Sequence, residues 1–192
     1  MNKQQWNQFL SEKIQSFIDH NNSNFKRFSK EQMDFRSAPG EWSANECLQH
    51  IIVFNELYMV QFKAIIAQTY KNPIFTLFSR SVGRTLVEAA TPGSEPSKTY
   101  GLYEPANFEL ETTSVAQAFN LHLQQLSQVI RQLKEISIRK IKLRSPSSEK
   151  LKFSLEDGLK LVVMHTERHM IQAMQQLEIH QIKSKGPRRK SL

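Results

Sequence analysis

Apolar residues recur at intervals of three and four in four long segments, and this spacing constrains the fold more than any other feature of the sequence. It places the apolar side chains on one face of a helix, which must then pack against other helices. Between these segments the sequence shows no strand-helix alternation, no internal repeat and no glycine-rich phosphate loop. The pattern therefore predicts an all-α fold, a bundle of four amphipathic helices.

Capping signals mark the starts of two of these helices. Ser43 is followed by Glu46, and Ser154 is followed by Asp157, each at the spacing of a side chain that caps a helix N-terminus. We expect the helix after Ser43 to end at residues 71–73, because proline cannot continue a helix.

The remaining boundaries are less sharply marked. The first helix either pauses in the polar run 21–24 or continues to about residue 28, and the fourth is expected over 155–182. The connection 71–113 is long, with room for a short helix within 74–88 and several prolines after it. The third helix is expected to start near residue 113 or 114. After it, the basic loop 136–152 could contain a brief extended piece.

The net charge of +8 is concentrated in two short segments. Residues 139–152 and 183–192 each carry a net charge of +5, which leaves −2 for the rest of the chain. We expect a single domain over residues 1–182 and a disordered basic tail over 183–192, because the tail has almost nothing apolar to bury. The tail could contact phosphates non-specifically, and nucleic-acid binding is one alternative function. The near-neutral body and the lack of a recognisable reading motif argue against a specific nucleic-acid partner.

The cysteine count and the hydropathy bear on location. Cys47 is the only cysteine, so no internal disulfide can form, and a reducing cytoplasm is the simplest compartment. No apolar run approaches the roughly 18 residues of a membrane-spanning helix. The first residues also lack the apolar core of a signal peptide. We therefore expect a cytoplasmic protein with no membrane partner.

Three histidines are candidate metal ligands. His165 and His169 lie four residues apart, so both imidazoles leave the same face of a helix, where they could meet one metal ion. His50 is the candidate third ligand, because it lies among apolar residues where a buried ring needs a polar partner. The alternative for His50 is a core histidine that is hydrogen-bonded to a backbone carbonyl, and the spacing alone does not decide between the two.

Two stretches of sequence resemble a known family. Pro39-Gly40-Glu41-Trp42-Ser43, followed by Glu46, Leu48 and His50, is similar to the second-helix signature of the DinB-like metalloproteins. Phe153-Ser154-Leu155, which leads to His165-x-x-Arg168-His169, is similar to their fourth-helix signature. The run Ile141-Lys142-Leu143-Arg144-Ser145-Pro146 resembles a subgroup of that family. The resemblance covers most of the chain, to about residue 177.

The resemblance implies a fold and a class of activity. It implies a four-helix bundle in up-down-down-up order, with the long crossover between helices 2 and 3, and a divalent metal held by His50, His165 and His169. Some members are transferases or isomerases that use a low-molecular-weight thiol such as bacillithiol. We therefore expect a metal-dependent thiol transferase whose partners are a small-molecule electrophile and such a thiol. The alternative is a non-catalytic metal-binding or stress-response module of the same fold.

The chemistry of the three imidazoles agrees with a reactive metal. Three histidines leave at least one coordination position open, whereas structural zinc usually has four protein ligands. An open position can bind a thiol as its thiolate, so no nucleophilic residue of the protein would be required, and we assign no catalytic residue. Histidine ligands suit several metals, with zinc or nickel expected first and iron as an alternative. A homodimer is plausible, although no apolar stripe requires one.

Other polar residues near these signatures have competing interpretations. Cys47 could be a fourth ligand, but an ordinary core position is the preferred interpretation. Arg168 points away from the two histidines of its helix and either binds an anionic substrate or forms a solvated ion pair, which we favour. His122 could reach the site, but a core or surface position is favoured. Glu46 is interpreted first as a cap.

Overall fold

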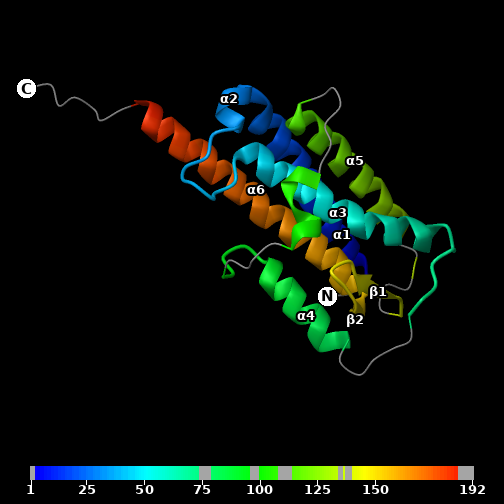
Figure 1. The fold of residues 1–192 in the computed structure, drawn as a ribbon. Helices are drawn as coiled ribbons and strands as arrows, with labels where there is room; N and C mark the ends of the chain where they lie inside the picture. Colours follow the sequence, from blue (N-terminus) through cyan, green and yellow to red (C-terminus); the bar gives the residue numbers. More distant parts are fainter. Residues whose placement is uncertain are drawn as a thin grey trace, which may run out of the picture.

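The computed structural model describes residues 3–73, 79–95, 100–107, 114–133, 136 and 140–185, and it is mostly helical (Figure 1). Its four long helices are α1 (Lys3–Ser23), α3 (Ala44–Ile66), α5 (Val115–Leu133) and α6 (Leu155–Lys185). Both α1 and α3 pack against α5 and α6. The four expected helices are therefore present, and each has two of the others as neighbours.

Shorter elements fill the connections between the long helices. They are η1 (Phe25–Arg27), α2 (Lys30–Met33), α4 (Ser79–Ala90), η2 (Gly101–Tyr103), η3 (Pro105–Asn107), β1 (Lys142–Ser145) and β2 (Ser148–Ser154). The helix α4 lies against α6 and β2, and η2 and η3 lie against α3 (Figure 1). The expected short helix in the long connection is therefore α4, while residues 74–78 lie outside the described part of the chain.

Side-chain caps set the starts of α3 and α6, as the sequence predicts. The Ser43 hydroxyl accepts a hydrogen bond from the Glu46 backbone N–H at 3.2 Å, and the Glu46 carboxylate accepts one from the Ser43 N–H at 2.9 Å. The Ser154 hydroxyl accepts a hydrogen bond from the Asp157 N–H at 3.0 Å. These bonds satisfy backbone donors that have no partner within the helix.

The C-terminal ends of the helices differ more from the predicted positions than their starts do. The helix α3 stops at Ile66, before the expected residues 71–73, because the chain turns at Gln68, whose φ is 58°. The Thr69 N–H then bonds back to the Ala64 carbonyl at 3.0 Å. The helix α1 does pause, at Ser23, and the short helix η1 follows it.

The helix α6 continues through Lys185, three residues beyond the expected boundary at 182. Residues 186–192 lie outside the described chain, so the disorder of the basic tail stays a prediction.

The mostly helical fold is consistent with the expected all-α class, and it adds one small antiparallel sheet. The strands β1 and β2 pair with Leu143 opposite Phe153, and both side chains are fully buried. Gly158 of α6 allows this packing, since a Cβ atom there would lie 2.2 Å from Leu143 Cδ1. The brief extended piece expected in the basic loop is thus a hairpin, although residues 137–139 lie outside the described chain.

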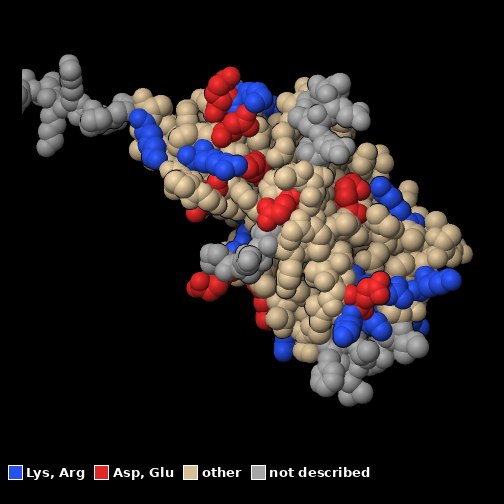
Figure 2. All heavy atoms as spheres, in the orientation of Figure 1, with Lys and Arg blue, Asp and Glu red and all other residues tan. Residues whose placement is uncertain are grey.

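The core is continuous across the four long helices. It includes fully buried side chains from each of them: Leu10, Ile14, Leu48, Ile51, Phe62, Phe119, Leu123, Leu126, Val162 and Val163. Within the described residues, no helix is both long and apolar enough to cross a membrane. On the face shown in Figure 2, acidic and basic side chains are interspersed with a broad uncharged area.

Candidate metal centre

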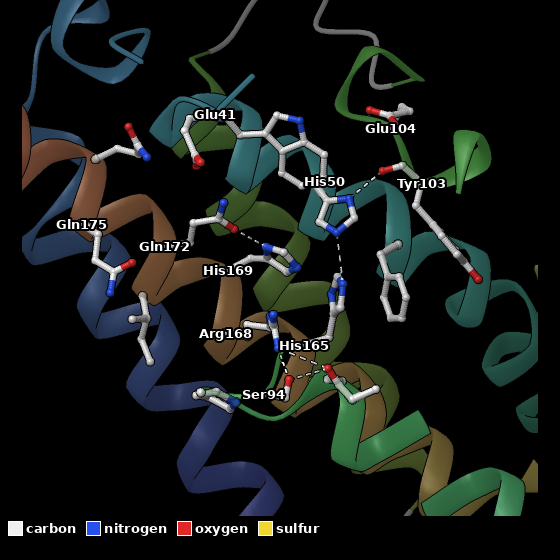
Figure 3. A pocket seen from close by; sticks show the side chains of 18 of the residues that line it. Glu41, His50, Ser94, Tyr103, Glu104, His165, Arg168, His169, Gln172 and Gln175 are labelled. Atoms are coloured by element: carbon white, nitrogen blue, oxygen red, sulfur yellow. Dashed lines mark hydrogen bonds between the residues drawn. The ribbon is translucent and has the colours of Figure 1, made fainter. Parts of the chain in front are cut away.

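The structure brings together the three histidines that the sequence singles out. His50 comes from α3, and His165 and His169 come from neighbouring turns of α6 (Figure 3). One ring nitrogen from each lies within 4.8 Å of the others, and the Nε2 atoms of His50 and His165 are 3.1 Å apart. Nitrogens bound to one tetrahedral zinc lie about 3.3 Å apart, given bonds of about 2.0–2.1 Å. The spacing therefore fits a shared metal ion.

Hydrogen bonds fix the proton on two of the rings. His50 Nδ1 donates to the backbone carbonyl of Tyr103 at 2.6 Å, and His169 Nδ1 donates to the Gln172 side-chain oxygen at 2.8 Å. An imidazole that is protonated at Nδ1 presents an unprotonated Nε2, which is the form that binds a metal. His50 thus has the backbone carbonyl partner expected for a core histidine, and it also belongs to the group of three histidines that could bind a metal.

The His165 ring is held by packing. It stacks on Phe54 with 3.6 Å between ring centroids and an angle of 15° between the planes. Its Nδ1 is buried and has no hydrogen-bond partner among the described residues. His165 thus presents Nε2 to the His50 ring, and it differs from the other two histidines in that no group among the described residues accepts a hydrogen bond from its Nδ1.

All three histidines are neutral at pH 7. Burial lowers the pKa of His50 to about 4, although its bond to the Tyr103 carbonyl acts in the opposite direction. Burial, together with the neighbouring His50, lowers the pKa of His169 to about 3. Burial also holds the pKa of His165 well below its ordinary value, helped by its two histidine neighbours. Neutral imidazole is the ligating form, so no proton has to leave before a metal binds.

The histidines lie in the wall of a large cleft. The cleft has a volume of about 1160 Å³ and is bounded by α3, α4, α6 and the segments 37–42, 92–94, 100–104 and 145–147. Trp42 lies over the histidines, with its ring centroid 4.6 Å from that of His50 and 6.0 Å from that of His169. A metal ion held here would therefore face a space that can admit a small molecule.

A family model matches most of the chain. The model of the DinB superfamily matches residues 21–173, a range that contains all three histidines. The chain belongs to the DinB superfamily. Neither the curated proteins nor the solved structures compared with it gave a match. The family resemblance expected from the two helix signatures is thus confirmed.

The ion pair expected for Arg168 is not found among the described residues of this DinB protein. The Arg168 guanidinium donates to the backbone carbonyls of Ala89 at 3.2 Å and Thr91 at 3.3 Å, and to the Ser94 hydroxyl. It also reaches the Glu95 carbonyl at 3.4 Å. The side chain therefore holds the segment that follows α4, which forms one wall of the cleft, and its other expected role, binding of an anionic substrate, stays a prediction.

The other candidate residues lie apart from the histidine cluster of this DinB protein. Cys47 is fully buried, and burial raises the pKa of its thiol, so it is a neutral core residue. His122 is buried between α5 and α3, where its Nδ1 lies 3.0 Å from Glu56 Oε1. Glu46 caps α3 and also pairs with Arg36.

Sequence reasoning missed the partners of the histidines. Tyr103 supplies a backbone carbonyl, which carries no signal in the residue type, and it lies 53 residues from His50. Gln172 and Phe54 did have a signal. Gln172 lies three residues after its partner His169, and Phe54, which stacks on His165, lies four residues after His50, so each shares a helix face with one of the three histidines.

Proposed function

We propose that this DinB-superfamily protein binds a divalent metal ion through His50, His165 and His169. We further propose that it joins a low-molecular-weight thiol, through its sulfur, to a small electrophile. The observation that carries the proposal is the convergence of three neutral imidazoles in the wall of an open cleft. Among the described residues, this group contains no fourth protein ligand, so a coordination position remains for a guest molecule. Zinc or nickel is expected first, and iron is the alternative.

The protein's own residues prepare the site in two ways. The Tyr103 carbonyl and Gln172 hold the protons of His50 and His169 on Nδ1, so both rings keep their orientation. Trp42 and Phe54 place aromatic surface beside the rings, which excludes water from one side. When bound, the metal would hold the thiol as its thiolate, which supplies a nucleophilic sulfur near pH 7.

The proposed transfer needs no oxidant or reductant, because the bonds formed and broken balance. The thiol proton leaves to solvent, the sulfur forms a bond to an electrophilic carbon, and the leaving group departs with its bonding electrons. No nucleophile from the protein is needed, and we assign no catalytic residue. The cleft beside the histidines is large enough to hold the electrophile.

Related expectations belong to the same proposal. We propose that α1, α3, α5 and α6 form the up-down-down-up bundle of the family, with α4 in its long crossover. The single cysteine supports a reducing compartment, and we propose the cytoplasm. We propose no specific nucleic-acid partner and no membrane partner, and a homodimer is the one assembly that we consider.

Metal analysis of untagged protein tests the metal centre. After reloading and desalting, the protein is expected to hold about one equivalent, and the double variant His165→Ala/His169→Ala less than a tenth of one. The variant His20→Ala/His180→Ala is the matched control, because it also removes two histidines but leaves the cleft intact. Equal retention by both double variants would remove the proposed metal centre.

A turnover assay tests the transfer. The loaded protein is incubated with a small chloro-aromatic electrophile and a panel of thiols that includes bacillithiol, and the thioether product is measured. Product formation that the His165→Ala/His169→Ala variant loses supports a transferase. Stoichiometric metal binding without product from any thiol supports the non-catalytic module instead.

A further inference from the structure

Four hydroxyl-bearing side chains lie together at one end of the cleft. Tyr58 comes from α3, Tyr103 from η2, Ser145 from β1, and Ser147 from the turn after β1, and all four line the cleft. Tyr58 is 1% exposed, Ser145 3% and Tyr103 7%. We call these four residues the hydroxyl floor. Three separate segments therefore deliver neutral polar groups to one buried place.

The members of the hydroxyl floor are linked to one another. The Ser145 and Ser147 hydroxyls are 2.9 Å apart. The Tyr58 hydroxyl lies near those of Ser145 and Tyr103, and the Tyr103 hydroxyl lies near Ser147, close enough for each neighbour to affect the pKa of the tyrosine. Each hydroxyl has one donor and two acceptor positions, so the bond between the two serines leaves most of the capacity of the four groups unused. The unused positions are available to a molecule in the cleft.

The helix α3 connects the floor to the metal centre. His50, Phe54 and Tyr58 follow one another at intervals of four residues, so they lie along one face, and all three line the cleft. At a rise of about 1.5 Å per residue, Tyr58 is about 12 Å along the helix from His50. Figure 3 shows the Tyr103 carbonyl facing His50 and the Tyr103 hydroxyl pointing away from it. A small molecule could therefore reach both ends.

The charge of this end indicates the chemical class of the ligand. Burial raises the pKa of Tyr58, so its hydroxyl is uncharged at neutral pH. In Figure 3 the Glu104 carboxylate lies on the opposite side of the Tyr103 backbone from the Tyr103 hydroxyl. Arg168 is already bound to the segment after α4. An ionic group on the floor would therefore be buried without a counter-ion, which is unfavourable.

We propose that the hydroxyl floor is a binding subsite for a neutral polar group, such as an alcohol, carbonyl or amide, on the substrate whose other end lies at the histidines. Leu86 and Leu161 also line the cleft and supply apolar surface for the body of such a molecule. The inference rests on the proposed function, because it assigns one end of the same substrate. It adds that the electrophile carries an uncharged hydrogen-bonding group.

Fluorine NMR titrations of the metal-free protein test the subsite independently of the metal. The probes are para-fluorobenzyl alcohol, para-fluorotoluene and para-fluorobenzoate, which share one ring and differ in the polar group. The alcohol is expected to bind about fivefold more tightly than the toluene, the factor of one net hydrogen bond, and the benzoate more weakly than the alcohol.

Variants then locate the effect. Tyr58→Phe and Ser145→Ala should each remove the advantage of the alcohol. Tyr70→Phe is the matched control, because its hydroxyl also bonds to β1, at the Lys142 carbonyl, but does not line the cleft. Circular dichroism melting curves verify that each variant is folded.

Three results would overturn the subsite: equal affinity for the alcohol and the toluene, tighter binding of the benzoate, or an advantage that survives in both floor variants. Failure of the proposed function can be told apart from failure of the subsite. The first would show as a lack of metal binding in the metal analysis, and it would leave the fluorine NMR titrations unchanged.

Discussion

His50 Nδ1 donates a hydrogen bond to the backbone carbonyl of Tyr103 at 2.6 Å, and this bond ties a ring on α3 to the short helix η2. The side chain of Tyr103 is also part of the hydroxyl floor. Tyr103 thus touches both ends of the cleft. The orientation of the His50 ring therefore depends on the placement of a segment that lies far away in the sequence.

The Gln172 side chain should contribute to metal affinity, because it orients the His169 ring through Nδ1. We expect Gln172→Ala to weaken metal binding about tenfold, at the lower end of the range for such outer partners. Competition with a chromophoric chelator measures the affinity. Gln175→Ala is the matched control, because Gln175 also lines the cleft on α6. An unchanged affinity for Gln172→Ala would show that the ring is held by packing alone.

The metal-free protein should lose stability in acid because of the buried histidines. Their pKa values are lowered by folding, to about 4 for His50 and about 3 for His169, against 6.5 for the unfolded chain. Below pH 6.5 the unfolded state therefore binds protons that the folded state does not, and the free energy of unfolding falls as the pH falls. This loss continues until the pH passes the folded-state pKa values.

Urea unfolding at several pH values between 7 and 4.5 measures this loss. The variant His169→Gln should show a shallower pH dependence than the wild-type protein, whereas Gln175→Ala, which removes an uncharged side chain of the same cleft, should keep the wild-type slope. Carboxyl groups also titrate in this range, so the difference between the two variants isolates the contribution of the histidine. Parallel curves for all three proteins would contradict the prediction.

Arg168 should hold the segment after α4 in place. We expect Arg168→Gln to lower the free energy of unfolding by about 1–3 kcal/mol, as for lost hydrogen bonds to a charged group, and to speed amide exchange in residues 89–95. Hydrogen exchange followed by mass spectrometry resolves this segment. Arg84→Gln is the control, since Arg84 forms an exposed pair with Glu88. Unchanged exchange at residues 89–95 would refute this role.

Gly158 should be required for docking of the β1–β2 hairpin on α6. A methyl group at this position would lie 2.2 Å from Leu143 Cδ1, so Gly158→Ala is expected to cost about 1–3 kcal/mol. Gly101→Ala should cost much less, because no atom lies within 4 Å of a Cβ built there. Thermal unfolding compares the two. Equal stability of both variants would mean that Leu143 moves aside freely.

Local signals predicted the helix starts and the histidine cluster. Ser43 and Ser154 bond to backbone groups three residues away, so the sequence alone indicates where α3 and α6 begin. His165 and His169 share a helix face because of their spacing, and the family resemblance adds His50. Each of these inferences needs only residues close in sequence or a motif of known arrangement.

The remaining features depend on contacts between distant segments. The strand β1 is only four residues long, and it exists because it pairs with β2 and packs on Gly158. The Tyr103 carbonyl and the carbonyls that Arg168 binds are backbone atoms, which every residue type has, so the sequence does not predict these hydrogen bonds. Nothing in the residue pattern groups Ser145 with Tyr58. These relationships become visible only when the chain is folded.

Arg168 follows His165 by three residues and precedes His169 by one, so five consecutive residues of α6 carry two candidate ligands and the side chain that holds a cleft wall. A rotation of this part of α6 would displace both rings and the 89–95 segment together. Two of the residues that would hold the metal and the residue that holds the 89–95 wall of the cleft are therefore carried by the same piece of α6.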